Sequence, residues 1–335
     1  MNFSRRSLLK SALLASAASA LPARAGWQRA ANLPYRVQEI YPVLHEGKIY
    51  VAGGISPDKS ESNFVARDVA VYSLSENSWK VGTRLPEPRH HPHLVSHQGI
   101  LYAFSGFILS GADRWYASGD VLWLDESEGQ VAKWKKLKTK MPHPLCETVA
   151  TSYQGRIHLV SGRKPLGKAN GRWQDHVDVN SHWLFDTAEN RWSQAKPVPT
   201  ARNSAAGVCL NNQWFVFGGR TVNGGNLAVN EVYDFKSDRW EKRAPMPQAQ
   251  GGLAAAAIKD RIYVFGGEFF DNGGGVFKEV WEYSVREDHW RKVGEMPLPR
   301  HGLGAVAYDD SIFVIAGATK ASGNGTSDRM SVFRL

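Results

Sequence analysis

Residues 262–267 read Ile-Tyr-Val-Phe-Gly-Gly, four apolar residues followed by two glycines. An apolar run that ends in a small residue and a glycine occurs six times, at residues 49–54, 100–106, 157–162, 214–219, 262–267 and 312–317. A short, continuous apolar run is typical of a strand that is buried on both faces. Glycine at the end of a strand favours a turn or a close backbone approach. The six runs therefore predict a repeated β structure.

Other residues keep phase with these runs. The tryptophans at 27, 79, 134, 192, 240 and 290 are spaced by 52, 55, 58, 48 and 50 residues. A proline follows each tryptophan after seven residues, or after eight in one case. Four tryptophans are preceded, seven residues earlier, by an aromatic residue: Tyr72, Phe185, Tyr233 and Tyr283. A period near 50 residues indicates a repeat architecture in which each unit is one small sheet.

The order of apolar run, glycine pair, variable loop, aromatic residue and tryptophan resembles the Kelch repeat, and the resemblance covers Trp27 to Leu335. It implies an all-β fold, a six-bladed Kelch-type β-propeller in which each unit forms a four-stranded sheet. The last unit has no tryptophan strand of its own. We therefore expect residues 27–34 to pair beside residues 329–335, because this closure hides both sheet edges.

The first 25 residues are predicted to be an export signal, which leaves residues 26–335 for the propeller. Arg5 and Arg6 precede an Ala-rich apolar run over residues 11–21, and Ala23-Arg24-Ala25 fits a cleavage site. The run is too short to span a bilayer. Residues 4–10 resemble the twin-arginine (Tat) motif, and a Sec signal with two arginines is the alternative. We expect a periplasmic protein, exported by the Tat pathway.

The charge and the cysteines exclude other classes. The formal charge of +9 falls by four, to +5, without residues 1–25. The densest lysines, at positions 133–140, alternate through an expected edge strand, so we expect no nucleic-acid partner. No further segment is long and apolar enough to span a membrane, and we expect a monomer. Repeat alignment places Cys146 and Cys209 roughly 20 Å apart, which predicts two free thiols.

Candidate ligand-binding residues come from the loops at one mouth of the ring. We define the lead position as the residue seventeen before the final glycine of each unit. By the resemblance, side chains here surround the mouth, and arginine suits an acidic ligand because its fork can bind a carboxylate through two bonds. The alternative is that these arginines pair with acids of the ring or with loop carbonyls. The ligand-binding candidates are Arg36, Arg89, His90, Arg202, Asn203, Gln250, Arg300 and His301.

The loops after the glycine pairs supply a second set of candidates for the mouth. This set comprises Asp113, Arg114, Trp115, Trp173, Asp175, His176 and Asp178. The sequence 90–93, His-His-Pro-His, resembles a metal cluster, but alternation in a strand would place only His91 and His93 on one face. This spacing is unlike that of known structural metal sites. We predict neither a metal ion nor another cofactor.

Two functions remain open. The first is a periplasmic binding protein that recognises a protein, a peptide or an acidic glycan at the mouth, since Kelch propellers commonly serve as binding scaffolds. The second follows from a distant resemblance to periplasmic Kelch proteins of the sialic acid mutarotase (N-acetylneuraminate epimerase) family. Glu147 and Glu39 are the candidate catalytic residues for that reaction. A deep pocket with a carboxylate of raised pKa beside an arginine would favour the enzyme.

Overall fold

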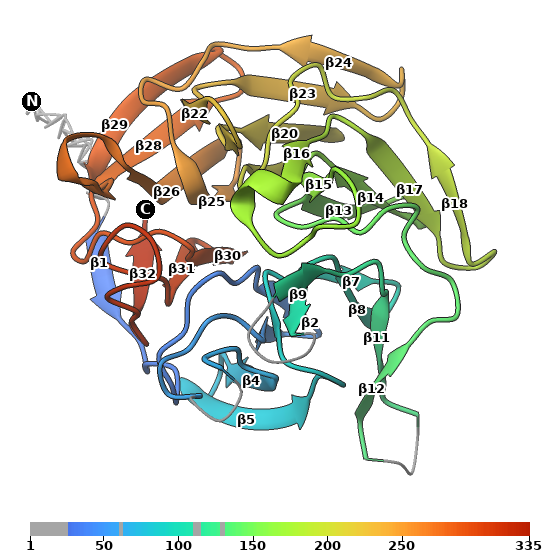
Figure 1. Cartoon of the computed structure of the whole chain (residues 1–335). Coiled ribbons are helices and arrows are strands. Elements are labelled where there is room, and N and C mark those ends of the chain that lie inside the picture. The colour runs from blue at the N-terminus through green and yellow to red at the C-terminus, as the bar shows by residue number, and fades with distance from the viewer. Residues whose placement is uncertain (1–25, 60–62, 110–114, 128–130) are drawn as a thin grey trace, which may run out of the picture.

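The computed structural model describes residues 26–59, 63–109, 115–127 and 131–335. These residues form strands and two short 3₁₀ turns, arranged as sheets around a central axis (Figure 1). No helix in these ranges has the length and apolar character needed to cross a bilayer. The export signal predicted for residues 1–25 lies outside the described residues, as do Asp113 and Arg114.

Six sheets, numbered here as blades 1 to 6, follow one another along the described chain. Each contains four antiparallel strands in a simple meander, and blade 5 carries the additional short strand β27 (Gly275–Val276). From the axis outward, blade 1 consists of β2 (Val43–His45), β3 (Lys48–Ala52), β4 (Asp68–Ser73) and β5 (Ser78–Arg84), and blade 2 of β7 (His93–His97), β8 (Ile100–Phe104), β11 (Leu122–Asp125) and β12 (Lys133–Lys136). Blade 3 consists of β13 (Val149–Tyr153), β14 (Arg156–Val160), β17 (His182–Asp186) and β18 (Arg191–Gln194), and blade 4 of β19 (Ala206–Leu210), β20 (Gln213–Phe217), β23 (Asn230–Asp234) and β24 (Arg239–Lys242). Blade 5 consists of β25 (Gly251–Ile258), β26 (Arg261–Phe269), β28 (Glu279–Ser284) and β29 (His289–Glu295), and blade 6 of β30 (Gly304–Tyr308), β31 (Ser311–Ile315), β32 (Met330–Arg334) and β1 (Gly26–Arg29).

The predicted closure is confirmed by the pairing of β1 with β32. Trp27 pairs with Phe333 and Arg29 with Ser331, so the first strand of the chain completes the last blade (Figure 1). The innermost strands contact one another in the order β2, β7, β13, β19, β25 and β30, and β30 returns to β2. The ring is therefore continuous, and neither end of the chain leaves an inner strand unpaired.

Backbone hydrogen bonds from the glycine pairs join each blade to the next. The N–H of the final glycine donates to the carbonyl of the lead residue in the following unit, over 2.8–3.2 Å. The link from Gly317 to Val37 closes the circle between blades 6 and 1 at 2.9 Å. The six links are Gly54 to Arg89, Gly106 to Leu145, Gly162 to Arg202, Gly219 to Gln250, Gly267 to Arg300 and Gly317 to Val37.

This close approach explains why glycine ends the apolar run. At Gly266, a Cβ atom would lie 2.1 Å from the carbonyl oxygen of Arg300. At Gly267, φ is +106°, a value that residues with a side chain rarely adopt. The glycine pair therefore both ends β26 and lets the next blade approach the exposed amide.

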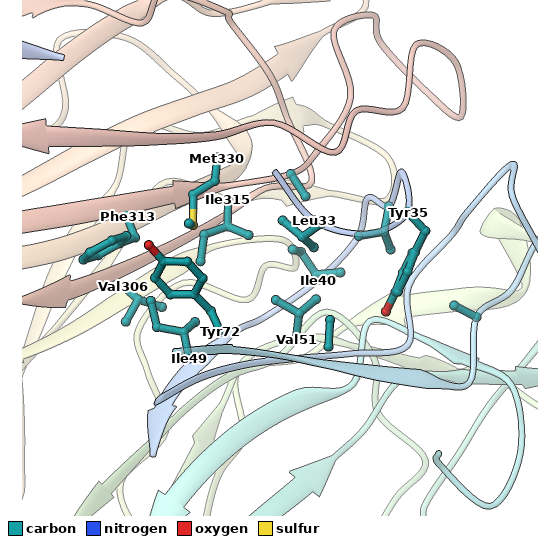
Figure 2. Packing of buried hydrophobic residues seen from close by; sticks show 14 of the residues in the cluster. Leu33, Tyr35, Ile40, Ile49, Val51, Tyr72, Val306, Phe313, Ile315 and Met330 are labelled. Carbon is teal, nitrogen blue, oxygen red and sulfur yellow. The ribbon is translucent and has the colours of Figure 1, made fainter. Parts of the chain in front are cut away.

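Six apolar clusters lie between neighbouring blades, one for each pair, and a smaller seventh lies around Phe107 in the mouth ribbons. Figure 2 shows the cluster between blades 6 and 1, where Phe313 and Met330 face Ile49 and Tyr72. Burying a large apolar side chain stabilises a fold by about 1.5–3 kcal/mol. The interface between blades 6 and 1, where the two ends of the chain meet, is thus packed with apolar side chains like the other five interfaces between blades.

Four of the six repeated tryptophans, at positions 27, 79, 240 and 290, also donate a hydrogen bond to the neighbouring blade. In blade 5, Trp290 Nε1 donates to the Ala244 carbonyl of blade 4 over 2.8 Å, while the Ala244 N–H donates to Asp288. Tyr283, seven residues before the tryptophan, orients Asp288 by donating its hydroxyl proton over 2.6 Å. The spacing of seven therefore has a physical cause. The same three-residue arrangement occurs with Tyr72, Asn77 and Trp79, and with Tyr233, Asp238 and Trp240.

Small ribbons extend beyond the glycine pairs and form the walls of one mouth of the ring. They are β6 (Arg89–His90) with β9 (Phe107–Leu109) and β10 (Trp115–Ala117), β15 (Arg163–Pro165) with β16 (His176–Asp178), β21 (Arg220–Thr221) with β22 (Gly225–Asn226), and the end of β26 with β27. The 3₁₀ turns η2 (Trp173–Asp175) and η3 (Asp271–Gly273) lie in the connecting loops.

Removal of residues 329–335 should abolish the cooperative thermal unfolding of a protein that comprises residues 26–335. The deletion removes β32, so β1 loses its partner and β31 keeps β30 alone; blade 6 then cannot close and the ring opens. Circular dichroism on heating measures the effect. Arg334→Ala, an exposed change in the same strand, serves as the control. A truncated protein that unfolds within a few degrees of the wild type would contradict the closure.

Candidate functional site

Two residues after each lead position, the chain adopts a left-handed backbone conformation. The six residues are Glu39, His91, Glu147, Ser204, Gly252 and Gly302, with φ between +51° and +69°. Side-chain-bearing residues in this conformation each cost about 1–3 kcal/mol and occur most often at functional sites. Four of the six positions hold a residue with a side chain in this conformation, and these side chains are two carboxylates, an imidazole and a hydroxyl.

Backbone hydrogen bonds connect these left-handed residues in a belt around the axis. Glu39 N–H donates to the Gly302 carbonyl over 2.7 Å, and His91 N–H donates to Glu39 over 3.0 Å. The belt continues from Ser204 to Glu147, from Gly252 to Ser204 and from Gly302 to Gly252, at 3.0–3.2 Å. The belt thus fixes the backbone at the base of the mouth.

A cavity of about 610 Å³ opens above this belt. Its floor holds Glu39, His91 and Glu147, and its walls come from the mouth ribbons. The residue that directly follows the final glycine lines the cavity in five of the six units: Ile55, Phe107, Arg163, Arg220 and Glu268. A volume of this size lies within the range for small-molecule sites.

Glu147 lies at the centre of one charged cluster. Arg163 donates to Glu147 Oε1 from Nε over 3.0 Å and from Nη2 over 2.7 Å. Ser204 Oγ donates to Oε2 over 2.5 Å. Burial alone would raise the pKa of Glu147, but the charges of Arg163 and His91 lower it far below its ordinary value. Glu147 is therefore ionised and its oxygens are occupied by its own neighbours.

Glu39 belongs to a second cluster, which contains two histidines and a further acid. His91 Nε2 lies 2.8 Å from Glu39 Oε2, and His301 Nδ1 lies 3.6 Å from Oε1. His301 Nδ1 is also 3.5 Å from Glu268 Oε1. Burial acts to raise the pKa of Glu39, but the charge and hydrogen bond of His91 outweigh it and lower the pKa to about 2. Glu39 therefore carries its charge at neutral pH.

The imidazoles of His90 and His91 form a hydrogen-bonded pair, with their Nδ1 atoms 2.6 Å apart. Burial, with the charge of His91, lowers the pKa of His90 well below its ordinary value, so His90 is neutral. His90 Nε2 is left without a hydrogen-bond partner among the described residues.

Three arginines line the cavity, Arg163, Arg172 and Arg220, and aromatic side chains cover the first and the last of them. The Arg163 guanidinium lies 4.2 Å from the ring centre of Trp173 and 4.9 Å from that of Phe107. Arg220 lies 5.3 Å from the Trp173 ring. Trp173 is itself held by a hydrogen bond of 2.8 Å from Nε1 to the Val222 carbonyl. Guanidinium groups stacked on aromatic faces keep their charge while losing water.

The two arginines differ in how many donors remain for a ligand. All three nitrogens of Arg163 are engaged, by Glu147 and by His176 Nδ1 at 3.2 Å. Arg220 donates from Nη1 to Glu268, and its Nε has no partner among the described residues. Burial would lower the pKa of Arg220, but Glu147 and Glu268 raise it above its ordinary value. Of the two arginines that stack on Trp173, Arg220 is thus the one with donors to spare.

Four predicted ligand-binding residues lie at the lead position itself, outside the cavity lining. Arg89, Arg202, Gln250 and Arg300 are fully buried. Their side chains donate to carbonyls of their own blades, such as Ser105 for Arg89, Val216 for Arg202, Gly266 for Gln250 and Ala316 for Arg300. Arg202 also pairs with the buried Glu231. These lead-position side chains therefore follow the alternative given in the sequence analysis: they bond acids or carbonyls of the protein and do not face a ligand.

Two further candidates also lie outside the cavity lining. Arg36 is half exposed and pairs with Asp58, because Val37 occupies the lead position of its unit. Asn203 is buried and donates to Asp178 over 2.5 Å. Both side chains therefore bond other residues of the protein.

The remaining predicted residues converge on the cavity. Glu39, Glu147 and His90 line it, and His301 contacts its acids from below. Trp115 and Trp173 also line it. The sequence analysis missed Arg163, Arg220, Glu268 and Ser204. Their signal was positional: the first three directly follow a final glycine, and Ser204 lies two residues after a lead position.

The expected alternation of His91 and His93 is wrong. His91 has φ of +57°, so the strand is interrupted between β6 and β7 and strand alternation does not apply to the two side chains. His93 instead bonds the Thr148 carbonyl at 3.0 Å and stacks on Tyr41. The prediction of two free thiols is confirmed for Cys146 and Cys209. Burial raises the pKa of the Cys146 thiol well above its ordinary value, which makes it a poor nucleophile.

Comparison with known proteins supports the repeat assignment. Residues 169–335 match the family model described as the KLHDC2/KLHL20/DRC7 Kelch-repeats domain. Beta-scruin of Limulus polyphemus is 26% identical over 54% of this chain and 19% of its own length. Mouse Kelch-like protein 35 is 30% identical over 58% of this chain and 29% of its own length. The chain thus spans less than a third of these curated relatives.

Similarity of fold extends over nearly the whole chain. The solved structure of YjhT superposes with a TM-score of 0.76 and 18% sequence identity, covering 91% of this chain and 96% of that chain. The glycine-pair repeats, the six meander sheets and this superposition agree. The chain therefore has the fold of a Kelch-type β-propeller.

Proposed function

We propose that the cavity is the binding site for a small acidic glycan. One observation carries this proposal: Arg220, at the cavity wall, has unused donors and lies beside the Trp173 ring. A planar guanidinium suits a sugar carboxylate, and aromatic faces suit the apolar faces of a sugar ring. The volume of about 610 Å³ favours a small glycan over a folded protein partner.

The acids of the cavity favour binding over carboxyl-acid catalysis. Glu39 and Glu147 have lowered pKa values, so neither holds a proton to donate at neutral pH. Nδ1 of His301 lies 3.6 Å from Glu39 Oε1, beyond good hydrogen-bond range. It can therefore accept a hydrogen bond from a sugar hydroxyl while Arg220 holds the carboxylate.

Isothermal titration with N-acetylneuraminate, glucuronate and uncharged N-acetylglucosamine tests this proposal. Wild-type protein should bind the two acids, and Arg220→Gln should weaken the binding at least tenfold because the guanidinium fork is lost. Arg36→Gln, which changes an arginine outside the cavity, should bind like the wild type. Binding of none of the acids, or an equal affinity in Arg220→Gln, would refute the proposal. Preference for a short acidic peptide would identify a peptide site instead.

Buried lead-position arginines provide a second control for the same titration. Arg202→Met should leave the affinity of the folded protein unchanged, since Arg202 does not line the cavity. It should lower the free energy of unfolding by about 3–5 kcal/mol, because Glu231 would remain buried and unpaired. If the affinity for the acids fell while the free energy of unfolding stayed unchanged, Arg202 would be a ligand-binding residue after all.

A second candidate function, mutarotation of an acidic sugar such as sialic acid, is favoured by the hydrogen-bonded chain from His90 through His91 to Glu39. Opening a sugar ring moves the anomeric hydroxyl proton to the ring oxygen, and reclosure on the other face exchanges the anomers. A neutral His90 with its proton on Nδ1 can take the anomeric hydroxyl proton at Nε2 and, as the imidazolium that results, give it to the ring oxygen. Glu39 would stabilise the positive charge that develops on the imidazole pair.

Catalysis would appear as accelerated equilibration of N-acetylneuraminate anomers, followed by NMR. Glu39→Gln should reduce the acceleration by about a hundredfold or more, since general acid–base groups contribute 10²–10⁴-fold. Glu279→Gln, which changes an acid outside the cavity lining, should retain the wild-type rate. Acid binding without any acceleration would leave the binding function and exclude the mutarotase.

We also propose that residues 1–25 direct Tat export to the periplasm, on the basis of Arg5 and Arg6 and the apolar run that follows. Cell fractionation of the full chain should place the processed protein in the periplasm. Replacing both arginines with lysine should retain the unprocessed chain in the cytoplasm, while a replacement of Arg24 should not. Periplasmic protein from the double-lysine variant would indicate the Sec alternative.

A further inference from the structure

A second group of polar side chains lies at the other end of β2 from Glu39, between blades 1 and 2. His45 is the last residue of β2, Glu46 begins the turn that follows, and Glu126 comes directly after β11. One ligand atom from each residue lies within 4.8 Å of the others. In the part of the chain that the structure describes, this is the one grouping of such residues.

The His45 ring is buried and its orientation is fixed. The side chain is 1% exposed, and Nδ1 lies 2.8 Å from Ser96 Oγ of blade 2. Its ring also packs edge-on against Tyr50, with the ring centres 5.6 Å apart. Nε2, by contrast, has no hydrogen-bond partner, and the nearest carboxylate oxygen, Glu126 Oε2, is 3.9 Å away.

This arrangement leaves a buried nitrogen facing two acids with nothing between them. When Nδ1 donates to Ser96, Nε2 presents a lone pair toward the carboxylates of Glu46 and Glu126. A lone pair and two negative charges repel one another unless a cation lies among them. A ligating histidine is normally held in this manner, with its other nitrogen bonded to a neighbouring side chain.

Comparison with the next blade shows that the acid pair is particular to this place. His97 ends β7 as His45 ends β2, and its Nδ1 lies 2.8 Å from Ser152 Oγ. The turn residue after His97 is Gln98, where the first blade has Glu46. The fold therefore repeats the buried histidine, while the two carboxylates occur around His45.

We propose that His45, Glu46 and Glu126 bind a divalent transition-metal ion of the Zn²⁺ class between blades 1 and 2. One imidazole with two carboxylates suits zinc, whereas Mg²⁺ and Ca²⁺ prefer oxygen ligands throughout. Bonds of about 2.0–2.2 Å place tetrahedral ligand atoms about 3.3 Å apart, so the group must contract slightly. Both glutamates are exposed and can move inward, while His45 stays fixed. A solvent molecule would complete the coordination.

Equilibrium dialysis of the mature protein against Zn²⁺, after treatment with EDTA, tests the site. Wild-type protein should bind one equivalent of Zn²⁺, and the metal should raise the melting temperature, since it joins two blades. Glu46→Gln and Glu126→Gln should each weaken the binding at least tenfold while leaving the metal-free melting temperature unchanged. Mg²⁺ at the same concentration should produce no shift.

Asp309→Asn provides the matched control, because Asp309 occupies the turn of blade 6 that corresponds to Glu46 and likewise has positive φ. It should bind Zn²⁺ like the wild type. His45→Gln should abolish binding, with circular dichroism checking that it folds. Absence of Zn²⁺ binding by the wild type, or wild-type affinity in both glutamate variants, would overturn the proposal. Neither result bears on acid binding in the cavity, where none of the three residues lies.

Discussion

The structure depends on one contact that is repeated six times: the amide of a glycine donates to the first carbonyl of the next blade. The contact is short because no side chain separates the two backbones. It fixes the distance and angle between neighbouring sheets at their mouth ends, and the apolar clusters fix them along their length. Closure follows, since blade 6 offers Gly317 to Val37 as every other blade does to its neighbour.

The same contact places the functional groups. A residue directly after the glycine must emerge at the mouth, and a residue two positions after the lead carbonyl must turn into the left-handed conformation above the axis. These two positions supply Arg163, Arg220 and Glu268 from the walls, and Glu39, His91 and Glu147 from the floor. The propeller therefore brings acids and bases from different blades together. The attraction between their opposite charges offsets part of the free energy needed to remove them from water.

The repeat was visible in the sequence because glycine pairs, tryptophans and prolines are required by backbone contacts that do not vary between units. The pairing of residues 26–29 with residues 331–334 was predictable for the same reason. The site was less predictable, since choosing between adjacent loop positions requires knowing where each side chain points. Arg202 and Arg220 illustrate the difficulty: both are arginines near the mouth of blade 4, yet one bonds its own sheet and the other lines the cavity. Periodicity identifies equivalent positions, but a left-handed residue such as His91 breaks the alternation on which strand arguments rest.

The belt of left-handed residues is not uniform around the axis. Five of its six links are present among the described residues, and the link from Glu147 N–H to the His91 carbonyl is the one that is missing. Blades 2 and 3 therefore lack this backbone bond at the floor, and Glu147 and His91 lie on either side of the gap. A guest that draws these two side chains together would supply the missing connection, so occupancy and rigidity of the floor would rise together.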